Sequence, residues 1–466
     1  MKKSILLLSV AALAFSANAQ NEENEAAEYN QYGQKVESLP AQASFQDGVM
    51  VFQNKERGYK LWFDTRVQAD AGFFFGGPEW TKDEKIDGKL NPDHIGNGAT
   101  LRRTRFAVKA QLGKNWYGEI DADFTRGTFE LKDAIVAYTG IQGLEIKAGN
   151  FKENFSMNRN STSRYLMFME RPMATYLAPS RHLGINATYE NPYVWGAFGV
   201  FGPEVEGEAL QTLSEDANKA GQNEGLSYTG KLVLRPFGGK GDFMLHVGGA
   251  YSYRMPKTSA EEGYRCVRYS TRNSTSINRK KYVDTDVITG VDHEVAYTAE
   301  LAGLYKGLRF EGAYIARGAY LDRAVNDKDT QWFDGWYGEA SYLLFGGKQN
   351  YDAGGAKFTR ITPGKKWGDL EFAVRYQTID LNSKDYYGGA SSMWQFGLNF
   401  YPHKNVKLVV NYGIVNNDRY ANGKGKLLVG YDADGKPTKD FTKVVDEKGK
   451  AGVDYQQLTF RAQIAF

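Results

Sequence analysis

The sequence repeats one pattern that restricts what it can fold into: segments of roughly ten residues in which apolar and polar side chains alternate. In the last segment, Tyr455 to Phe466, one face carries Leu458, Phe460, Ala462, Ile464 and Phe466, and the other carries Gln457, Thr459, Arg461 and Gln463. Successive side chains of a β-strand point to opposite faces, so this period predicts strands rather than helices.

Sixteen segments show this pattern. They lie near residues 60–75, 99–113, 115–125, 129–140, 143–151, 182–190, 193–202, 226–236, 243–255, 293–306, 308–320, 330–346, 368–382, 391–402, 405–417 and 455–466. An even number of antiparallel strands closes a barrel with both chain ends on one side, and sixteen strands leave a lumen wide enough for water. The expected fold class is all-β, a 16-stranded antiparallel transmembrane β-barrel.

Soluble sandwiches also alternate, but three features favour a barrel in a membrane. Charged residues occupy the polar face even in mid-strand, as at Asp121, Lys147 and Arg375, which a water-filled lumen tolerates and a dry core does not. Aromatic residues such as Tyr251 and Trp394 gather near strand ends, as in the girdles at lipid–water interfaces. The third feature is the length of the connections.

Short and long connections alternate along the chain. Single residues or pairs such as 114, 191–192, 307 and 403–404 alternate with the long stretches 76–98, 152–181, 203–225, 256–292 and 418–454. Outer-membrane barrels have short periplasmic turns and long external loops. The connection 347–367 breaks this rule, because it is long where a short turn is expected.

The first nineteen residues have the composition of a signal peptide. Lys2 and Lys3 precede an apolar core from Ile5 to Phe15, and the small residues 17–19 predict cleavage before Gln20. Residues 20–58 are acidic or amide-rich at their start and poorly periodic, so we expect a flexible N-terminal segment and a barrel from 59 to 466.

Composition excludes several other classes of protein. The mean hydropathy is −0.53 and no later apolar run approaches the ~18 residues of a membrane helix. Cys266 is the single cysteine, which excludes a disulfide scaffold. The formal net charge of +3 falls to about +1 on cleavage and gives no reason to expect nucleic-acid binding.

The connection between the fifth and sixth segments, in the position of the third external loop, combines basic and apolar residues. Between Gly149 and Gly184 it carries an apolar run from Tyr165 to Met169, and the cations Lys152, Arg159, Arg164, Arg171 and Arg181. A loop of this composition is expected to fold inward, so that its apolar side packs on the barrel wall and its arginines face the pore. Rings of arginine in a pore favour anions.

These residues resemble the phosphate-selective porins O and P, and the resemblance runs from about residue 47 to the C-terminus. The most telling matches are Leu101-Arg102-Arg103, Leu131-Lys132-Asp133-Ala134, and Ser161-Thr162-Ser163-Arg164 through Glu170-Arg171. The resemblance implies a trimeric outer-membrane channel in a Gram-negative bacterium, with a narrow site that holds an anion.

The resemblance also implies which residues hold the anion. Its basic ligands would be Arg66, Arg102, Arg103 and Arg164, with Ser163 as hydroxyl donor and Asp133 as acidic member, and Arg105, Arg171 and Arg181 would line the pore beside them. Strict alternation would put only one of the adjacent Arg102 and Arg103 in the lumen, whereas a β-bulge would bring in both.

The function expected from the sequence is a porin for passive diffusion with a preference for anions, inorganic phosphate or polyphosphate among them. The alternatives are a porin for other small solutes without phosphate selectivity, and a surface adhesion protein anchored by the barrel. No cofactor, metal or enzymatic activity is expected, because the five histidines are scattered and no nucleophile signature accompanies them. Outer-membrane lipid and two further copies of the chain are the other expected partners.

Overall fold

The computed structural model describes residues 30–36, 40–46, 48–127, 129–202, 204–205, 225–259, 262–445 and 451–466. The predicted signal peptide and its cleavage site lie outside these residues. The chain divides into two units, Met1–Ala41 and Gln42–Phe466. In the first unit, the amide of Gly33 donates to the carbonyl of Asn30 and closes a turn.

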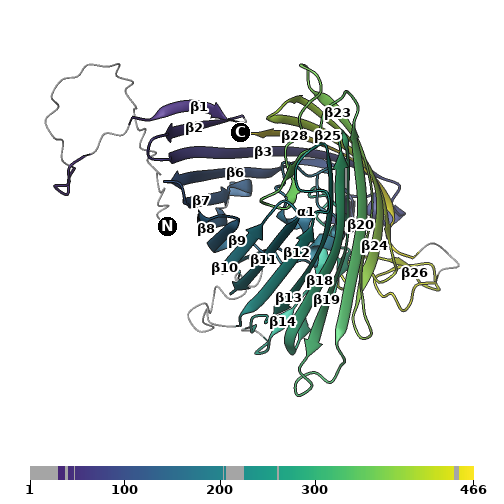
Figure 1. The fold of residues 1–466 in the computed structure, drawn as a ribbon. Coiled ribbons are helices and arrows are strands. Elements are labelled where there is room, and N and C mark those ends of the chain that lie inside the picture. The colour runs from purple at the N-terminus through teal and green to yellow at the C-terminus, as the bar shows by residue number, and fades with distance from the viewer. Residues whose placement is uncertain are drawn as a thin grey trace. The chain divides into compact units, whose positions relative to one another are not determined.

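Sixteen strands of the second unit form a closed antiparallel barrel, in chain order (Figure 1). They are β3 (Tyr59–Phe75), β6 (Gly98–Leu112), β7 (Trp116–Asp123), β8 (Glu130–Ile141), β9 (Leu144–Lys152), β10 (Arg181–Glu190), β11 (Val194–Phe201), β12 (Ser227–Leu234), β13 (Phe243–Arg254), β18 (Val291–Tyr305), β19 (Leu308–Leu321), β20 (Gln331–Leu343), β23 (Asp369–Asn382), β24 (Tyr387–His403), β25 (Val406–Asn417) and β28 (Tyr455–Ala465). The predicted fold class is confirmed, and each predicted segment coincides with one of these strands.

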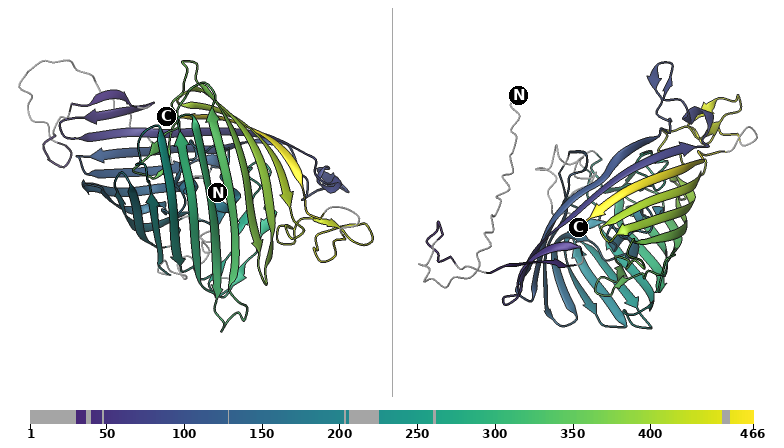
Figure 2. Two further views of the ribbon diagram at one scale, coloured as in Figure 1. Left: turned by 45° about the vertical axis from the view of Figure 1, so that its right-hand side comes forward. Right: turned by 90° about the horizontal axis from the view of Figure 1, so that it is seen from above.

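The barrel closes where β28 pairs with β3, from Gln456 opposite Phe75 to Ala465 opposite Arg66 (Figure 2). The outer face carries exposed apolar side chains, among them Phe63, Phe106, Val108, Ile120 and Val136. That arrangement suits contact with lipid, since every backbone group of a closed barrel is paired within the wall. Among the residues described, no helix is long and apolar enough to cross a membrane.

The remaining elements are short and lie in the connections. They are β1 (Gln42–Gln46), β2 (Val49–Asn54), η1 (Glu79–Thr81), β4 (Lys85–Ile86), β5 (Lys89–Leu90), η2 (Thr125–Gly127), α1 (Met157–Asn160), η3 (Met173–Tyr176), β14 (Cys266–Val267), β15 (Ser270–Thr271), β16 (Val283–Asp284), β17 (Ile288–Thr289), β21 (Tyr351–Asp352), β22 (Lys357–Phe358), β26 (Gly430–Tyr431) and β27 (Pro437–Thr438).

The strands β1 and β2 correct one expectation. Residues 20–58 were expected to be flexible, but β1 pairs with β2, and β2 pairs with β3 from Asn54 opposite Tyr59 to Val51 opposite Trp62. The strand β2 therefore occupies the edge of β3 beyond the point where β28 ends. Pairing with the free edge of β3 orders this segment. The alternation within residues 42–54 is too short to predict which strand they pair with.

The inner face of the wall from β18 to β28 is filled by paired charges. Arg317 donates to Glu294 at 2.7 Å, Arg375 lies 2.6 Å from Glu339, and Arg461 lies 2.7 Å from Asp70. All are nearly inaccessible to solvent except for part of Arg317. Buried charges need such partners, because an isolated ion loses its hydration.

Candidate functional site

The loop between β9 and β10 begins with a capped helical turn. Ser156 precedes α1, and its Oγ accepts a hydrogen bond from the amide of Arg159 at 3.3 Å, as an N-cap residue does. The predicted apolar run follows. Met167 and Phe168 are buried against Ala373 of β23.

Backbone groups of the loop are held by side chains of the wall. The amide of Met169 donates to Asn411 Oδ1 at 3.0 Å, and the amide of Met173 donates to Gln377 Oε1 at 2.7 Å. The loop between β13 and β18 reaches the same wall, where Asn273 Nδ2 donates to Ser391 Oγ at 2.7 Å. Both loops therefore lie inside the barrel and contact the wall at β23 to β25.

A β-bulge turns both Arg102 and Arg103 into the lumen. The register of β6 against β3 shifts where Arg103 pairs with Gln68 and Leu101 pairs with Ala69, which leaves Arg102 as the extra residue. Arg102 Nε and Nη2 donate to Glu170 at 2.6 and 3.0 Å. Arg103 Nη1 donates to Gln68 Oε1 at 2.8 Å. The bulge that the adjacent arginines suggested is present.

A cavity of about 710 Å³ lies between the inward loop and the wall. Eight of the nine predicted residues line it, namely Arg66, Arg103, Arg105, Asp133, Ser163, Arg164, Arg171 and Arg181. The ninth, Arg102, does not line the cavity and instead fastens Glu170 of the loop. The structure therefore brings eight of the nine residues together around one cavity, and their role in holding an anion stays a prediction.

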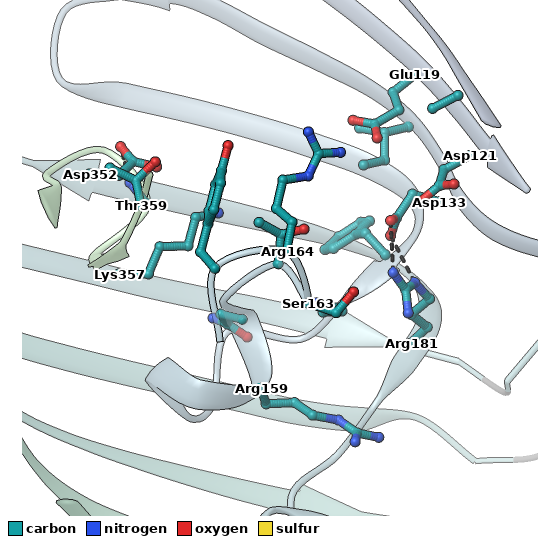
Figure 3. A pocket seen from close by; sticks show the side chains of 18 of the residues that line it. Glu119, Asp121, Asp133, Arg159, Ser163, Arg164, Arg181, Asp352, Lys357 and Thr359 are labelled. Atoms are coloured by element: carbon teal, nitrogen blue, oxygen red, sulfur yellow. Dashed lines mark hydrogen bonds and ion pairs between the residues drawn. The ribbon is translucent and has the colours of Figure 1, made fainter. Parts of the chain in front are cut away.

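Carboxylates along the wall of the cavity are paired with cations. Arg181 donates to both oxygens of Asp133, at 3.0 and 2.9 Å (Figure 3). Arg105 Nε lies 3.0 Å from Asp123. Lys109 lies 3.0 Å from Asp64, which also pairs with Arg164. These pairs hold the wall in place and cancel most of its charge locally.

Glu119, Asp121 and Asp133 lie close enough together to be considered as metal ligands, since their oxygens fall within 4.8 Å of one another. Each of them nevertheless has a cationic partner. Glu119 lies 3.3 Å from Lys109, and Asp121 lies 3.7 Å from Arg105. The cluster is therefore part of the paired wall.

Five cations of the cavity have no such partner. Among the residues described, no carboxylate lies within 4.0 Å of a charged nitrogen of Arg66, Lys152, Arg159, Arg171 or Lys357. Three of these cations donate hydrogen bonds to neutral oxygens instead. Arg66 Nη1 donates to Ser163 Oγ at 2.7 Å, Lys152 Nζ to the carbonyl of Ser161 at 3.2 Å, and Arg171 Nη2 to the same carbonyl at 2.6 Å.

The charges around the cavity do not balance. Eleven Lys and Arg side chains line it against six carboxylates, a surplus of five positive charges. Burial and the neighbouring Arg159 lower the pKa of Arg171, which means that its charged form lacks compensation. Guanidinium groups present several donors in one plane and suit oxyanions. This arrangement can attract an anion and bind it through several hydrogen bonds.

Several lining residues were missed as members of the site. Asp64 and Lys109 share the inward parity of Arg66 and Arg105 on their strands, so alternation could have found them. Lys357 lies in the connection 347–367, whose path has no signal in the sequence.

A closed sixteen-stranded barrel with apolar side chains outside and a charged lumen defines an outer-membrane porin. The profile of the family of phosphate-selective porins O and P matches residues 80–434, and the chain belongs to this family. The suspected family is thereby confirmed. The family and the fold place the protein in the outer membrane of a Gram-negative bacterium and point to a channel rather than an enzyme.

Individual relatives are distant. Porin O of Pseudomonas aeruginosa is 24% identical over 403 residues, which cover 80% of this chain and 86% of that protein. A protein of Caulobacter vibrioides is 26% identical over 390 residues, covering 82% of this chain and 73% of the other. The solved anion-selective porin from Comamonas acidovorans shares the fold, with a TM-score of 0.51 and 12% identity over 88% of this chain and all of that one.

Proposed function

We propose that this protein is a passive diffusion channel that prefers anions, with inorganic phosphate or polyphosphate as the solute. The observation that carries the proposal is the surplus of five positive charges around the cavity. A charged pore concentrates ions of the opposite sign and excludes those of its own sign.

The arrangement around Arg66 supports phosphate within the class of anions. Arg66 and Ser163 supply guanidinium and hydroxyl donors side by side, and Arg103, Arg164 and Arg171 line the same cavity. A tetrahedral oxyanion has enough acceptors for donors on several sides, which a chloride ion satisfies less well. The carboxylates that line the same cavity lower its affinity for the anion. A channel requires such weak binding, because a conducted anion must be released again.

Recording from the purified protein in planar bilayers tests the proposal in two stages. In a KCl gradient, we expect a reversal potential of the sign given by chloride permeation, and a cation-selective or silent protein would refute the channel proposal. Phosphate should then block the chloride current at lower concentration than sulfate does. Equal block by the two oxyanions would leave an anion channel without phosphate preference and remove the finer part of the proposal.

Assembly into a trimer is part of the same proposal and rests on the family. Gel mobility before and after boiling tests it together with the barrel. We expect a band of three chains that converts to a single unfolded chain on heating. A folded monomer at every detergent concentration would contradict the trimer and leave the channel proposal standing.

A further inference from the structure

A second cavity, of about 410 Å³, lies at the external end of the barrel and shares no lining residue with the first. It is formed by the last residues of β3, the connection 76–98 and the start of β28. Long connections such as 76–98 mark the external end of an outer-membrane barrel. Ligand pockets usually measure about 300–1,000 Å³, so this cavity has room for a small molecule or for one ring of a larger one.

The connection 76–98 is held in shape around the cavity. Asn91 Nδ2 donates to the carbonyls of Trp80 and Asp83, at 2.7 and 2.9 Å. The amide of Ile95 donates to the carbonyl of Thr81 at 2.9 Å. These hydrogen bonds tie the two halves of the connection to each other, so the cavity does not depend on a ligand for its shape.

The same connection is attached to the external loop 418–454. Asp93 Oδ1 accepts a hydrogen bond from the amide of Leu428 at 2.7 Å. The ring of Trp80 packs edge-on against Tyr431, with the ring centres 5.0 Å apart. A site whose walls are already fixed binds a ligand without an ordering cost in the protein.

Aromatic rings contribute to the lining of the cavity. Phe74 packs against Tyr455 with the ring centres 6.1 Å apart, and Phe75 stacks on Tyr412 at 6.4 Å. Neighbouring residues of a strand point to opposite faces, so the cavity borders both faces of the wall at its external rim. Fixed aromatic rings suit a ligand that has an apolar face.

Polar groups of the cavity retain unused hydrogen-bonding capacity. His94 Nδ1 is buried and has no partner among the residues described. Asn97 Oδ1 accepts from the amide of Phe74 at 2.8 Å, but its Nδ2 group has no partner in the described part of the chain. Thr81 Oγ1 donates to the carbonyl of Pro78 at 2.6 Å and can still accept. A buried polar group without a partner is costly, and a bound ligand that pairs with it removes this cost.

Two glycines keep these polar groups accessible. A methyl group at Gly77 would come within 2.6 Å of Thr81 Oγ1, and one at Gly96 within 2.8 Å of His94 Nε2. A side chain at either position would therefore cover a group that lines the cavity. Larger side chains at these positions should close the site, which provides a way to test it.

The cavity carries little net charge. No carboxylate is among the described residues that line it, and the ammonium of its lysine, Lys82, pairs with Glu79. The cavity in the lumen is lined mainly by arginine, lysine and paired carboxylates. The external cavity is therefore suited to a neutral ligand rather than to the anions expected in the lumen.

We propose that the external cavity is a carbohydrate-binding site that holds one neutral pyranose ring. Such a ring has an apolar face of C–H groups, which can lie against Phe74, and a rim of hydroxyl groups. Each hydroxyl both donates and accepts, and so complements His94 and Asn97. Soluble saccharides and the hexoses of the lipopolysaccharide core present the same chemistry at this side of the membrane.

The first test is saturation-transfer NMR on the purified protein in detergent. One sample contains a mixture of glucose, galactose, mannose and N-acetylglucosamine, and a second contains the lipid-free core oligosaccharide of lipopolysaccharide. We expect transfer to the ring C–H protons of a hexose in at least one sample. Transfer in the first sample identifies a soluble saccharide as ligand, and transfer in the second alone identifies the lipopolysaccharide core. No transfer in either sample would refute the proposal.

Three variants locate the binding. His94→Ala removes one hydrogen-bonding group while the backbone stays anchored, since Lys280 donates to the carbonyl of this residue. The dissociation constant of the bound saccharide should rise by about fivefold. Gly96→Leu should abolish the transfer, because its side chain covers the imidazole. His403→Ala is the matched control, because His403 is exposed in the turn between β24 and β25 and lies outside the cavity.

The outcomes also separate this site from the lumen. Transfer that persists in Gly96→Leu, or an equal affinity of His94→Ala and His403→Ala, would overturn the proposed location. The reversal potential in a KCl gradient should be the same for Gly96→Leu and the unmodified protein, and a changed value would place the cavity in the conduction path instead. Unchanged gel mobility of each variant before heating shows that its barrel is intact.

Discussion

Arg66 and Ser163 lie 97 residues apart in the chain and are joined by a 2.7 Å hydrogen bond from Arg66 Nη1 to Ser163 Oγ. The bond connects the barrel wall to the inward loop at the surface of the cavity. The same guanidinium has no carboxylate partner among the described residues. Its charge is therefore available to a bound anion.

Arg66→Gln should weaken block by phosphate. Hydrogen bonds to charged groups contribute about 1.5–3 kcal/mol, so the phosphate concentration at half block should rise by about tenfold or more. Chloride currents with added phosphate provide the measurement. Arg323→Gln serves as control, because Arg323 is 82% exposed in a loop. An unchanged half-blocking concentration in Arg66→Gln would remove Arg66 from the site.

Asp133 and Arg181 should have opposite effects on selectivity. Asp133→Asn leaves the guanidinium of Arg181 without its bidentate partner, so the anion preference should rise. Arg181→Gln leaves the carboxylate uncompensated, so the preference should fall by a similar factor. Reversal potentials of the two variants provide the comparison. A shift of both in the same direction would mean that the pair acts through structure rather than charge.

Glu170→Gln should loosen the inward loop. Burial raises the pKa of Glu170, but the guanidinium groups of Arg102, Arg103 and Arg461 outweigh burial and lower it. Removing the charge breaks a buried cluster, at a cost of about 3–5 kcal/mol. We expect noisier single-channel currents and a lower unfolding temperature, whereas Glu145→Gln at a more exposed pair should change neither. Quiet currents in Glu170→Gln would contradict this role.

The same cluster predicts how loop stability depends on pH. Because the pKa of Glu170 is lower in the folded protein, its contribution is complete above the ordinary glutamate pKa of about 4.3. The contribution is lost as the pH falls through the lower folded value. Current noise should therefore increase on acidification in the unmodified protein, and less so in Glu170→Gln.

Lys357 predicts a change of selectivity at alkaline pH. Burial lowers the pKa of its ammonium below the usual lysine value. An ammonium is charged below its pKa, so anion preference should decline as the pH rises through values below the ordinary lysine pKa of about 10.4. Reversal potentials measured against pH should show this decline in the unmodified protein and a flatter profile in Lys357→Gln. Identical profiles would exclude Lys357 as the titrating group.

The alternation of apolar and polar residues predicted the barrel well, because one face of each strand contacts lipid and the other faces the lumen. The wall residues Arg66, Arg103 and Arg105 could be placed for the same reason: parity on a strand decides whether a side chain faces the lumen. The inward path of the loop was predictable from the apolar run Tyr165 to Met169, which a solvent-exposed loop would not carry.

Other features depend on partners that are distant in the chain. The strand β2 is ordered by the edge that β28 leaves free on β3. The hairpin formed by β21 and β22 is held by Trp195, Arg235 and His246, which belong to other parts of the wall. The β-bulge lets both Arg102 and Arg103 point inward. The partner of Arg102 is Glu170, which belongs to the loop and lies 68 residues further along the chain. Nothing periodic in one segment encodes such pairings.

The bulge at Arg102 has a consequence for how this channel can vary. One extra residue lets a single strand present two neighbouring arginines inward, of which Arg102 anchors the loop through Glu170 and Arg103 lines the cavity. Deleting either arginine would restore strict alternation and leave a single arginine to anchor the loop or to line the cavity. Arg103 also lies 3.6 Å from Glu170, so substitution at position 103 is expected to change the cavity and the support of the loop together, whereas substitution at position 102 acts on the loop alone.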